Sequence, residues 1–170
     1  LEYAYQENEG GIAEALSLAR DFVDKDNSVV ILGDNTTDYD LTPDVHSFKE
    51  GAMVFLKEVP DPERFGVPVF SKDNPEQVEG IIEKPKSPPN NFAVIGLYVY
   101  DNQVFNFIDR IKPSGRGELE ITDVNNQYAK ENKLRFRKIQ GFWRDAGTFD
   151  TLLEANVFWA KRRESDKANK

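Results

Sequence analysis

Two aspartates, each placed between a short apolar run and a glycine turn, are the residues of this sequence best suited to chemistry. Asp34 follows Val29-Val30-Ile31-Leu32-Gly33, and Asp145 follows Phe142-Trp143-Arg144 and precedes Ala146-Gly147. In open α/β sheets, ligands bind beyond the carboxyl ends of the strands, where both carboxylates are expected. Asp34 alone is equally consistent with a cap on the next turn or helix. The second aspartate, Asp145, also lies between an apolar run and a glycine, and this repetition favours a shared site.

A divalent cation would remove the repulsion between two such carboxylates. At about 4 Å they repel by roughly 4 kcal/mol at an effective dielectric of about 20. Mg²⁺ suits the pair because it takes one or two carboxylates and leaves its other positions to water and substrate phosphates. We therefore expect Asp34 and Asp145 to share one Mg²⁺, although they lie far apart in the sequence.

Composition excludes several other classes of protein. The 170 residues suit one domain, and the net charge of −8 argues against a nucleic-acid partner. No apolar run approaches a membrane span, so no membrane partner is expected. The absence of cysteine excludes disulfides and fits a cytoplasmic location. The single histidine, His46, is expected on the surface and argues against a zinc site or a catalytic triad.

The hydrophobic pattern predicts an α/β fold with a mixed, mostly parallel sheet and helices on both faces. Residues 29–32 and 92–100 are expected to be central strands, with at least one strand beside 29–32 supplied by a longer parent protein and missing from this chain. Gly96 is expected to mark a close backbone approach. The predicted strands are 1–6, 29–32, 52–59, 67–70, 77–83, 92–100, 134–140 and 142–144, and the predicted helices 10–23, 42–49, 102–111, 118–130 and 149–163.

A second candidate binding element lies near the start of the chain. Gln6 ends the first predicted strand, and its amide can both donate to and accept from the edge of a pyrimidine base. Gly10 and Gly11 open the next helix, where free N–H groups suit an anionic or carbonyl-bearing ligand. A plain strand-to-helix turn explains the glycines as well. A strand that begins at residue 1, without an initiator methionine, suggests a piece of a longer protein.

Seven short motifs follow one another in order along nearly the whole chain. The motifs are Tyr-Ala-Tyr-Gln (3–6) with Gly-Gly-Ile-Ala-Glu-Ala-Leu (10–16), Val-Ile-Leu-Gly-Asp-Asn (30–35), Asp-Pro-Glu-Arg-Phe-Gly-Val (61–67), Glu-Lys-Pro (83–85), Ala-Val-Ile-Gly-Leu-Tyr (93–98), Arg-Gly-Glu-Leu-Glu-Ile-Thr-Asp-Val-Asn (116–125) and Trp-Arg-Asp-Ala-Gly-Thr (143–148). Each motif is weak alone, but the ordered set resembles the sugar-nucleotide pyrophosphorylases, a nucleotidyltransferase family, and most closely its glucose-1-phosphate thymidylyltransferase branch.

The resemblance implies a Rossmann-like fold, a homo-oligomer, and transfer of a nucleotidyl group from dTTP to glucose 1-phosphate. It also implies a role for each matching residue. Asp34 and Asp145 would hold the catalytic Mg²⁺, and Gln6 and Gly11 would contact the nucleobase. Glu83 would bind a sugar hydroxyl, Lys84 and Arg116 would bind phosphate, and Gly66 and Val94 would contact the sugar through their backbones.

The sequence departs from the family pattern in three ways. The glycine-rich loop that grips the triphosphate is absent, so residues 1–170 are expected to be roughly the C-terminal two-thirds of one nucleotidyltransferase domain and inactive alone. Phe65 stands where tyrosine is common, which removes one hydroxyl contact to the ligand. Phe149 stands where histidine is common, with little expected effect.

Two other readings remain open. The enzyme could use UTP or another sugar 1-phosphate, because Gln6 can read uracil as well as thymine. Alternatively, the chain could be a non-catalytic module that binds a sugar nucleotide. The retained pair Asp34 and Asp145 argues against the module, which would have no need of them. A Gly-Gly-x-Gly-Thr-Arg segment in a longer parent protein would favour the enzyme, and its absence would favour the module.

Overall fold

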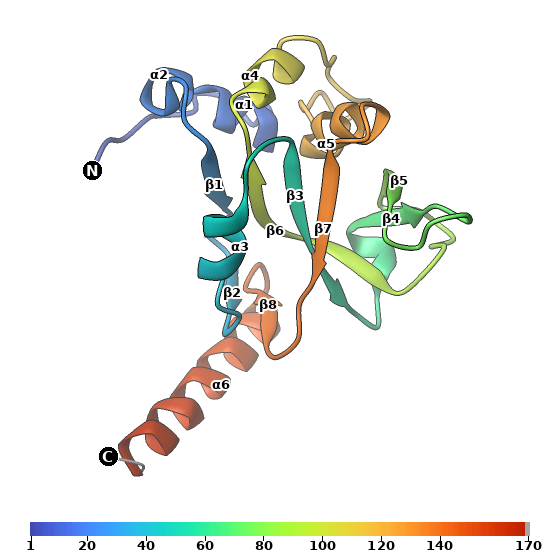
Figure 1. Ribbon diagram of the computed structural model, residues 1–170. Coiled ribbons are helices and arrows are strands. Elements are labelled where there is room, and N and C mark those ends of the chain that lie inside the picture. The colour runs from blue at the N-terminus through green and yellow to red at the C-terminus, as the bar shows by residue number, and fades with distance from the viewer. Residues whose placement is uncertain (169–170) are drawn as a thin grey trace.

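A six-stranded mixed sheet forms the body of the protein in the computed structural model, which describes residues 1–168 (Figure 1). Its strands run in the order β5-β4-β6-β3-β7, with β1 paired to β6. Their bounds are β1 Ser28–Ile31, β3 Ala52–Glu58, β4 Gly66–Phe70, β5 Val78–Glu83, β6 Phe92–Tyr100 and β7 Leu134–Lys138. Two further strands, β2 Asn35–Thr37 and β8 Trp143–Asp145, pair with each other in a separate ribbon.

Strand β6 is the centre of the sheet, as predicted for residues 92–100. It pairs with β3 on one side and with β1 and β4 on the other. Its apolar run is buried on both faces, since Tyr98 and Tyr100 join one hydrophobic cluster, while Leu97 and Val99 join the other. The α/β class and the mixed sheet are thus confirmed. Among the described residues only β3 and β7 pair in parallel, so antiparallel pairing is more extensive than expected.

Strand β1 corrects the prediction that residues 29–32 are central. It pairs only with β6, so its other edge carries no strand within the described residues. Val29 and Ile31 are 43% and 57% exposed, although their β-branched side chains suggested burial on both faces. The apolar run was read correctly as a strand, but its hydrophobicity does not reveal which of its two edges is paired.

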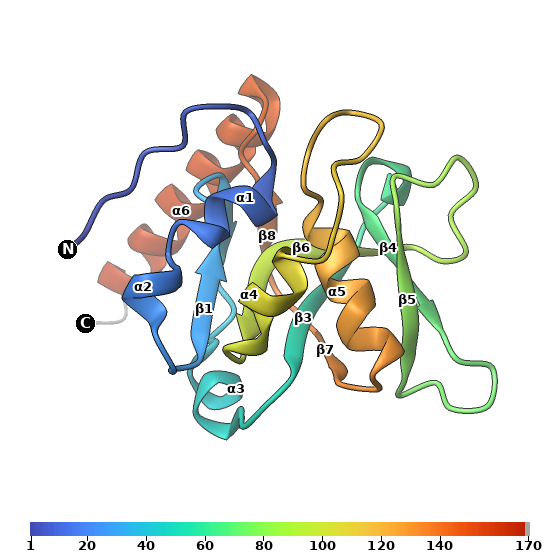
Figure 2. The same cartoon turned by 90° about the horizontal axis from the view of Figure 1, so that it is seen from above.

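Helices cover both faces of the sheet, as predicted. Buried residues of α1, α4 and α5 belong to one cluster, and α3 packs beside the other. Figure 2 views the molecule from the side on which α4 and α5 lie. The helical bounds are α1 Ile12–Ser17, α2 Arg20–Val23, α3 Thr42–Ser47, α4 Gln103–Ile108, α5 Ile121–Lys130 and α6 Phe149–Ala168, with a 3₁₀ turn at Pro62–Arg64. In the part of the chain described, no helix is long and apolar enough to cross a membrane.

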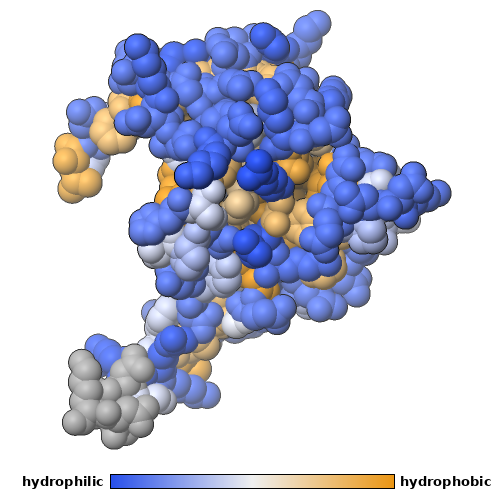
Figure 3. All heavy atoms as spheres, in the orientation of Figure 1, coloured by the Kyte–Doolittle hydropathy of each residue, from blue (hydrophilic) through white to orange (hydrophobic). Residues whose placement is uncertain are grey.

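The first 23 residues differ most from the prediction. Residues 1–6 form no strand, because no neighbouring strand pairs with their backbone, and their apolar side chains stand away from the body (Figure 3). The helix predicted to reach Val23 is interrupted between α1 and α2. Near the interruption, the Ser17 hydroxyl donates to the Glu14 carbonyl at 2.6 Å, a local bond that competes with helical pairing.

The β2–β8 ribbon positions the candidate chemistry. The chain leaves β1, turns at Gly33 and enters β2, where Asn35 lies opposite Asp145 of β8. Helix α6 follows β8 and extends away from the body (Figure 1). It is held to the ribbon by the Trp159 indole, which donates to the Thr36 hydroxyl at 2.7 Å. The two segments that carry the aspartates are therefore adjacent in space.

Candidate active site

A cleft of about 240 Å³ opens where β2, β4, β5, β6 and β8 meet the loop before α5. Its walls include both predicted aspartates and both predicted phosphate-binding cations. Seven of the nine predicted site residues line it: Asp34, Gly66, Glu83, Lys84, Val94, Arg116 and Asp145. Chain segments spread over more than 100 residues thus converge as predicted.

The two aspartates lie on adjoining parts of the ribbon. The Asp34 carbonyl accepts from the Ala146 N–H at 2.7 Å, and a Cβ added at Gly147 would lie 3.7 Å from Asp34 Oδ2. Asp34 is exposed and Asp145 is half-buried. The prediction that the two segments meet is confirmed. A cation shared by their carboxylates stays a prediction.

The donor set around the pair fits a hard divalent cation. Neither Asp34 nor Asp145 takes part in an ion pair with a described Lys or Arg side chain. Within residues 1–168, no group of three or more His, Cys, Asp or Glu forms a metal-binding cluster. A pair of carboxylates suits Mg²⁺, which keeps water and substrate phosphates in its other positions.

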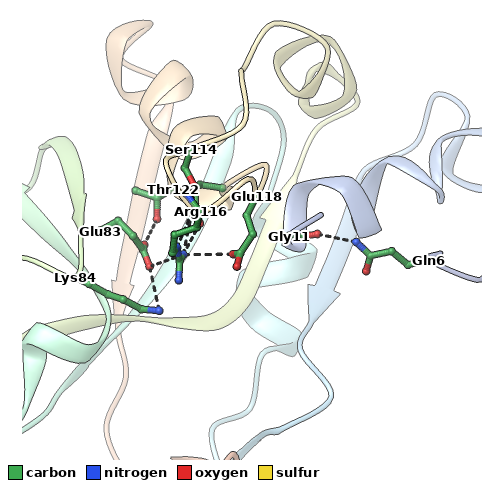
Figure 4. Close-up of polar contacts among 9 residues, drawn as sticks. Gln6, Gly11, Glu83, Lys84, Ser114, Arg116, Glu118 and Thr122 are labelled. Carbon is green, nitrogen blue, oxygen red and sulfur yellow. Dashed lines mark hydrogen bonds and ion pairs between the residues drawn. The ribbon is translucent and has the colours of Figure 1, made fainter. Parts of the chain in front are cut away.

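Glu83 and Lys84 lie next to each other at the end of β5, where both side chains contribute charge to the cleft (Figure 4). The Thr122 hydroxyl donates to Glu83 Oε2 at 2.6 Å, which leaves Oε1 beside the Lys84 ammonium at 4.0 Å. Lys84 adopts a left-handed backbone conformation with φ of 44°, which is unfavourable for a residue with a side chain. Its N–H donates to the Phe65 carbonyl at 3.0 Å, which holds this conformation.

Arg116 is surrounded by carboxylates. Its guanidinium donates to both oxygens of Glu120 at 2.9 Å, and Glu118 and Glu83 lie at 3.4 and 3.9 Å. The hydrogen bonds to Glu120, followed by its charge, raise the pKa of Arg116 above its usual value. A phosphate that binds Arg116 must therefore compete with these acids.

The cleft carries more negative than positive charge. Five carboxylates line it, against three cations, one of which is Arg64. The pKa of Arg64 is raised, chiefly by its hydrogen bond to Asp61 and to a smaller extent by Asp145. An anionic ligand entering such a site needs additional positive charge, which a bound cation would supply.

Gln6 and Gly11 do not line the cleft. The Gln6 amide donates to the Gly11 carbonyl at 3.2 Å and to Glu14 Oε2 at 2.6 Å. Figure 4 shows this pair at the start of α1, apart from the group around Arg116. Gly11 has φ of 92°, and a Cβ there would lie 2.6 Å from the Leu119 carbonyl oxygen. Close packing against Leu119 explains this glycine, and a nucleobase contact stays a prediction.

Several other cleft residues were not predicted as site residues. Asn35 directly follows Asp34 and Trp143 lies two residues before Asp145, and this proximity in sequence is the signal that could have identified them. Thr122 lies on a helix and Tyr98 on a core strand, and the sequence patterns of both elements indicate packing and no binding site. Phe65 packs edge-on against Trp143 with ring centroids 5.7 Å apart, so two aromatic rings form an apolar part of the cleft wall.

The mixed sheet, together with the ribbon that carries the aspartates, forms an α/β fold of the nucleotide-sugar transferase type, as the structural comparison shows. The family model described as nucleotidyl transferase matches residues 1–162, and the chain belongs to this family. A crystal structure from Bacillus anthracis, described as a glucose-1-phosphate thymidylyltransferase in complex with sucrose, is 49% identical with a TM-score of 0.85. It is matched over 92% of this chain and 64% of that chain.

Curated relatives agree with this assignment. The glucose-1-phosphate thymidylyltransferase of Xanthomonas campestris is 41% identical over 93% of this chain and 55% of its own length. The low-salt glycan biosynthesis nucleotidyltransferase Agl11 of Haloferax volcanii is 39% identical over 92% of this chain and 44% of its own. The chain thus spans about half the length of these relatives.

Proposed function

We propose that this chain forms part of an Mg²⁺-dependent enzyme that transfers a thymidylyl group from dTTP to glucose 1-phosphate. The products are dTDP-glucose and pyrophosphate. The observation that carries the proposal is the single cleft that gathers Asp34, Asp145, Glu83, Lys84 and Arg116. Membership of the nucleotidyl transferase family and the named relatives support the reaction class.

In the proposed reaction, a phosphate oxygen of the sugar phosphate attacks the α-phosphorus of the triphosphate. The bond from that phosphorus to the α–β bridging oxygen breaks, and pyrophosphate leaves with the bond's electrons. Such transfers depend on alignment and charge neutralisation more than on a proton-transfer residue. A Mg²⁺ held by Asp34 and Asp145 would supply neutralisation of the phosphate charge.

The remaining residues align the sugar phosphate. Lys84 and Arg116 bind its phosphate, while Glu83, fixed by Thr122, accepts a hydrogen bond from a sugar hydroxyl. Gly66 pairs with Val94 at the cleft, which supports the proposed contacts of these two backbones with the sugar. We also propose a homo-oligomeric enzyme, as the family resemblance implies.

A second candidate function is transfer to another sugar 1-phosphate or from UTP. It is favoured by relatives with other names, including the bifunctional protein GlmU of Methanococcus aeolicus, which is 34% identical over 98% of this chain. The third reading, a binding module without catalysis, is weakened because both aspartates are present and free of ion pairs with described lysines and arginines.

The test is pyrophosphate release by a chimaera in which residues 1–162 replace the matching stretch of the Xanthomonas campestris relative. We expect turnover with dTTP, Mg²⁺ and glucose 1-phosphate that disappears without the metal. Parallel assays with UTP and with N-acetylglucosamine 1-phosphate separate the first two candidates. A folded chimaera that binds both substrates without turnover would favour the binding module.

A further inference from the structure

Asn35 makes hydrogen bonds to three different parts of the site. Its Oδ1 accepts from the Gly96 N–H at 3.0 Å and from the Trp143 indole N–H at 2.8 Å. Its Nδ2 donates to Asp34 Oδ1 at 2.8 Å. A backbone N–H and an indole N–H can only donate, so the amide oxygen must face them and the NH₂ group must face the aspartate.

Asn35 is also a neighbour of both aspartates. Asn35 follows Asp34 in the chain and is the strand partner of Asp145. Its bonds join β2 to β6 through Gly96 and to β8 through Trp143. Because these partners belong to packed strands, they restrict rotation of the amide and therefore of the carboxylate that it holds.

Gly96 provides the room for this arrangement. A Cβ added there would lie 2.5 Å from Asn35 Nδ2 and 2.7 Å from Cγ, closer than real side-chain contacts. Any larger residue at position 96 would displace the amide. The close approach predicted for Gly96 is therefore confirmed, and its neighbour is the Asn35 side chain.

We propose that Asn35 is a positioning residue that orients the Asp34 carboxylate toward the cation shared with Asp145, an inference that rests on the proposed function. An exposed aspartate would otherwise rotate about its side-chain bonds. The amide holds Oδ1 and leaves Oδ2 available. Because the amide is neutral, it orients the carboxylate without cancelling the charge that a cation needs, as a lysine or arginine would.

The chain offers two spectroscopic reporters for this arrangement. It contains two tryptophans, and each indole N–H is hydrogen-bonded, Trp143 to Asn35 and Trp159 to the Thr36 hydroxyl. Neighbouring strand residues point to opposite faces, so the two indoles report on opposite sides of β2. In ¹⁵N-labelled protein their two indole signals can be followed without metal or activity.

The experiment compares the 170-residue chain with Asn35→Ala, Gly96→Ala and Gly33→Ala. Asn35→Ala removes the amide, and Gly96→Ala displaces it without changing either aspartate. Gly33→Ala is the matched control, because a Cβ there meets no atom within 4 Å. An unchanged Trp159 signal and a cooperative melting transition show that each variant is folded.

Metal affinity is read from the broadening of the Trp143 indole signal by MnCl₂. We expect the dissociation constant for Mn²⁺ to rise about tenfold or more in Asn35→Ala and Gly96→Ala, the usual effect of removing a group that orients a metal ligand. The metal-free Trp143 signal should also shift in both variants. Gly33→Ala should match the wild type in both respects.

Two results would overturn the inference in distinguishable ways. If Mn²⁺ broadens Trp143 equally in the wild type and both test variants, Asn35 does not position the ligand, and the proposed function stands. If Mn²⁺ leaves the wild-type Trp143 signal unchanged, the aspartate pair is not a cation site, and the proposed function fails together with the inference.

Discussion

The guanidinium of Arg116 is held by Glu120 through two equal hydrogen bonds of 2.9 Å, one to each carboxylate oxygen. The Ser114 hydroxyl donates to Glu120 Oε1 at 2.7 Å and fixes the acid in turn. The cation proposed to bind the sugar phosphate is therefore already engaged before any ligand arrives. This arrangement makes the affinity for the phosphate depend on how strongly Glu120 competes.

We expect Glu120→Gln to tighten glucose 1-phosphate binding. The pair is partly exposed, so its removal is worth up to about 1 kcal/mol, or roughly fivefold in the dissociation constant. Calorimetric titration of the chain with glucose 1-phosphate measures the effect. Glu118→Gln should have a weaker effect, since the Glu118 carboxylate lies farther from the guanidinium, at 3.4 Å. Weaker binding by Glu120→Gln would contradict the expected competition between Glu120 and the phosphate for Arg116.

Asp34→Asn and Asp145→Asn should each abolish nearly all turnover of the chimaera. Either change removes one charge from the site that binds the cation, and losses of about 10²–10³ in kcat are typical when one electrostatic group is removed. Asp73→Asn, in an exposed loop, is the matched control. Turnover within a factor of two of the wild type in either site variant would exclude a catalytic role for that aspartate.

Glu83→Ala should raise KM for glucose 1-phosphate more than it lowers kcat. A contact that is equal in the ground state and the transition state changes binding without changing the chemical step. Initial rates at varied sugar phosphate, with dTTP saturating, separate the two parameters. Thr122→Ala should produce the same pattern more weakly, because it releases Glu83 without removing its carboxylate. A loss in kcat without a rise in KM would show that Glu83 contacts the transition state more strongly than the ground state.

The 170-residue chain alone should release no pyrophosphate from dTTP, Mg²⁺ and glucose 1-phosphate. Its sequence lacks the glycine-rich loop whose cations grip the triphosphate in the family it resembles. Weak binding of glucose 1-phosphate through Glu83 and Lys84 should persist and be visible as shifts of cleft amide signals. Robust turnover by this chain would show that other residues within it bind the triphosphate.

Tyr39 should contribute a pH-dependent part of the stability. Burial, followed by its hydrogen bond to Asp44, raises the pKa of Tyr39 from 10.0 to about 12. The unfolded chain therefore loses this proton first, so the contribution is complete below pH 10 and is lost as the pH rises toward 12. The stability difference between wild type and Tyr39→Phe, from urea unfolding, should shrink over this range. A constant difference from pH 9 to pH 12 would contradict the raised pKa.

The sequence alone determined the elements that depend on local patterns. The nine-residue apolar run of β6 predicted a strand buried on both faces, because burial on each face requires an apolar residue at every position. The glycine turns after two apolar runs predicted where Asp34 and Asp145 would emerge. Gly96 indicated a close contact, although the identity of the neighbour could not be read from it.

Only the tertiary structure decided which groups meet. Hydrophobicity does not report which strand pairs beside a residue, so residues 29–32 are predicted at the centre, whereas β1 pairs on one edge alone within the described residues and leaves Val29 and Ile31 partly exposed. Thr122 reaches Glu83 from another element, and Asn35 reaches Gly96 and Trp143 across three strands. Such contacts join residues far apart in the chain, and their partners are selected by the packing of the whole sheet.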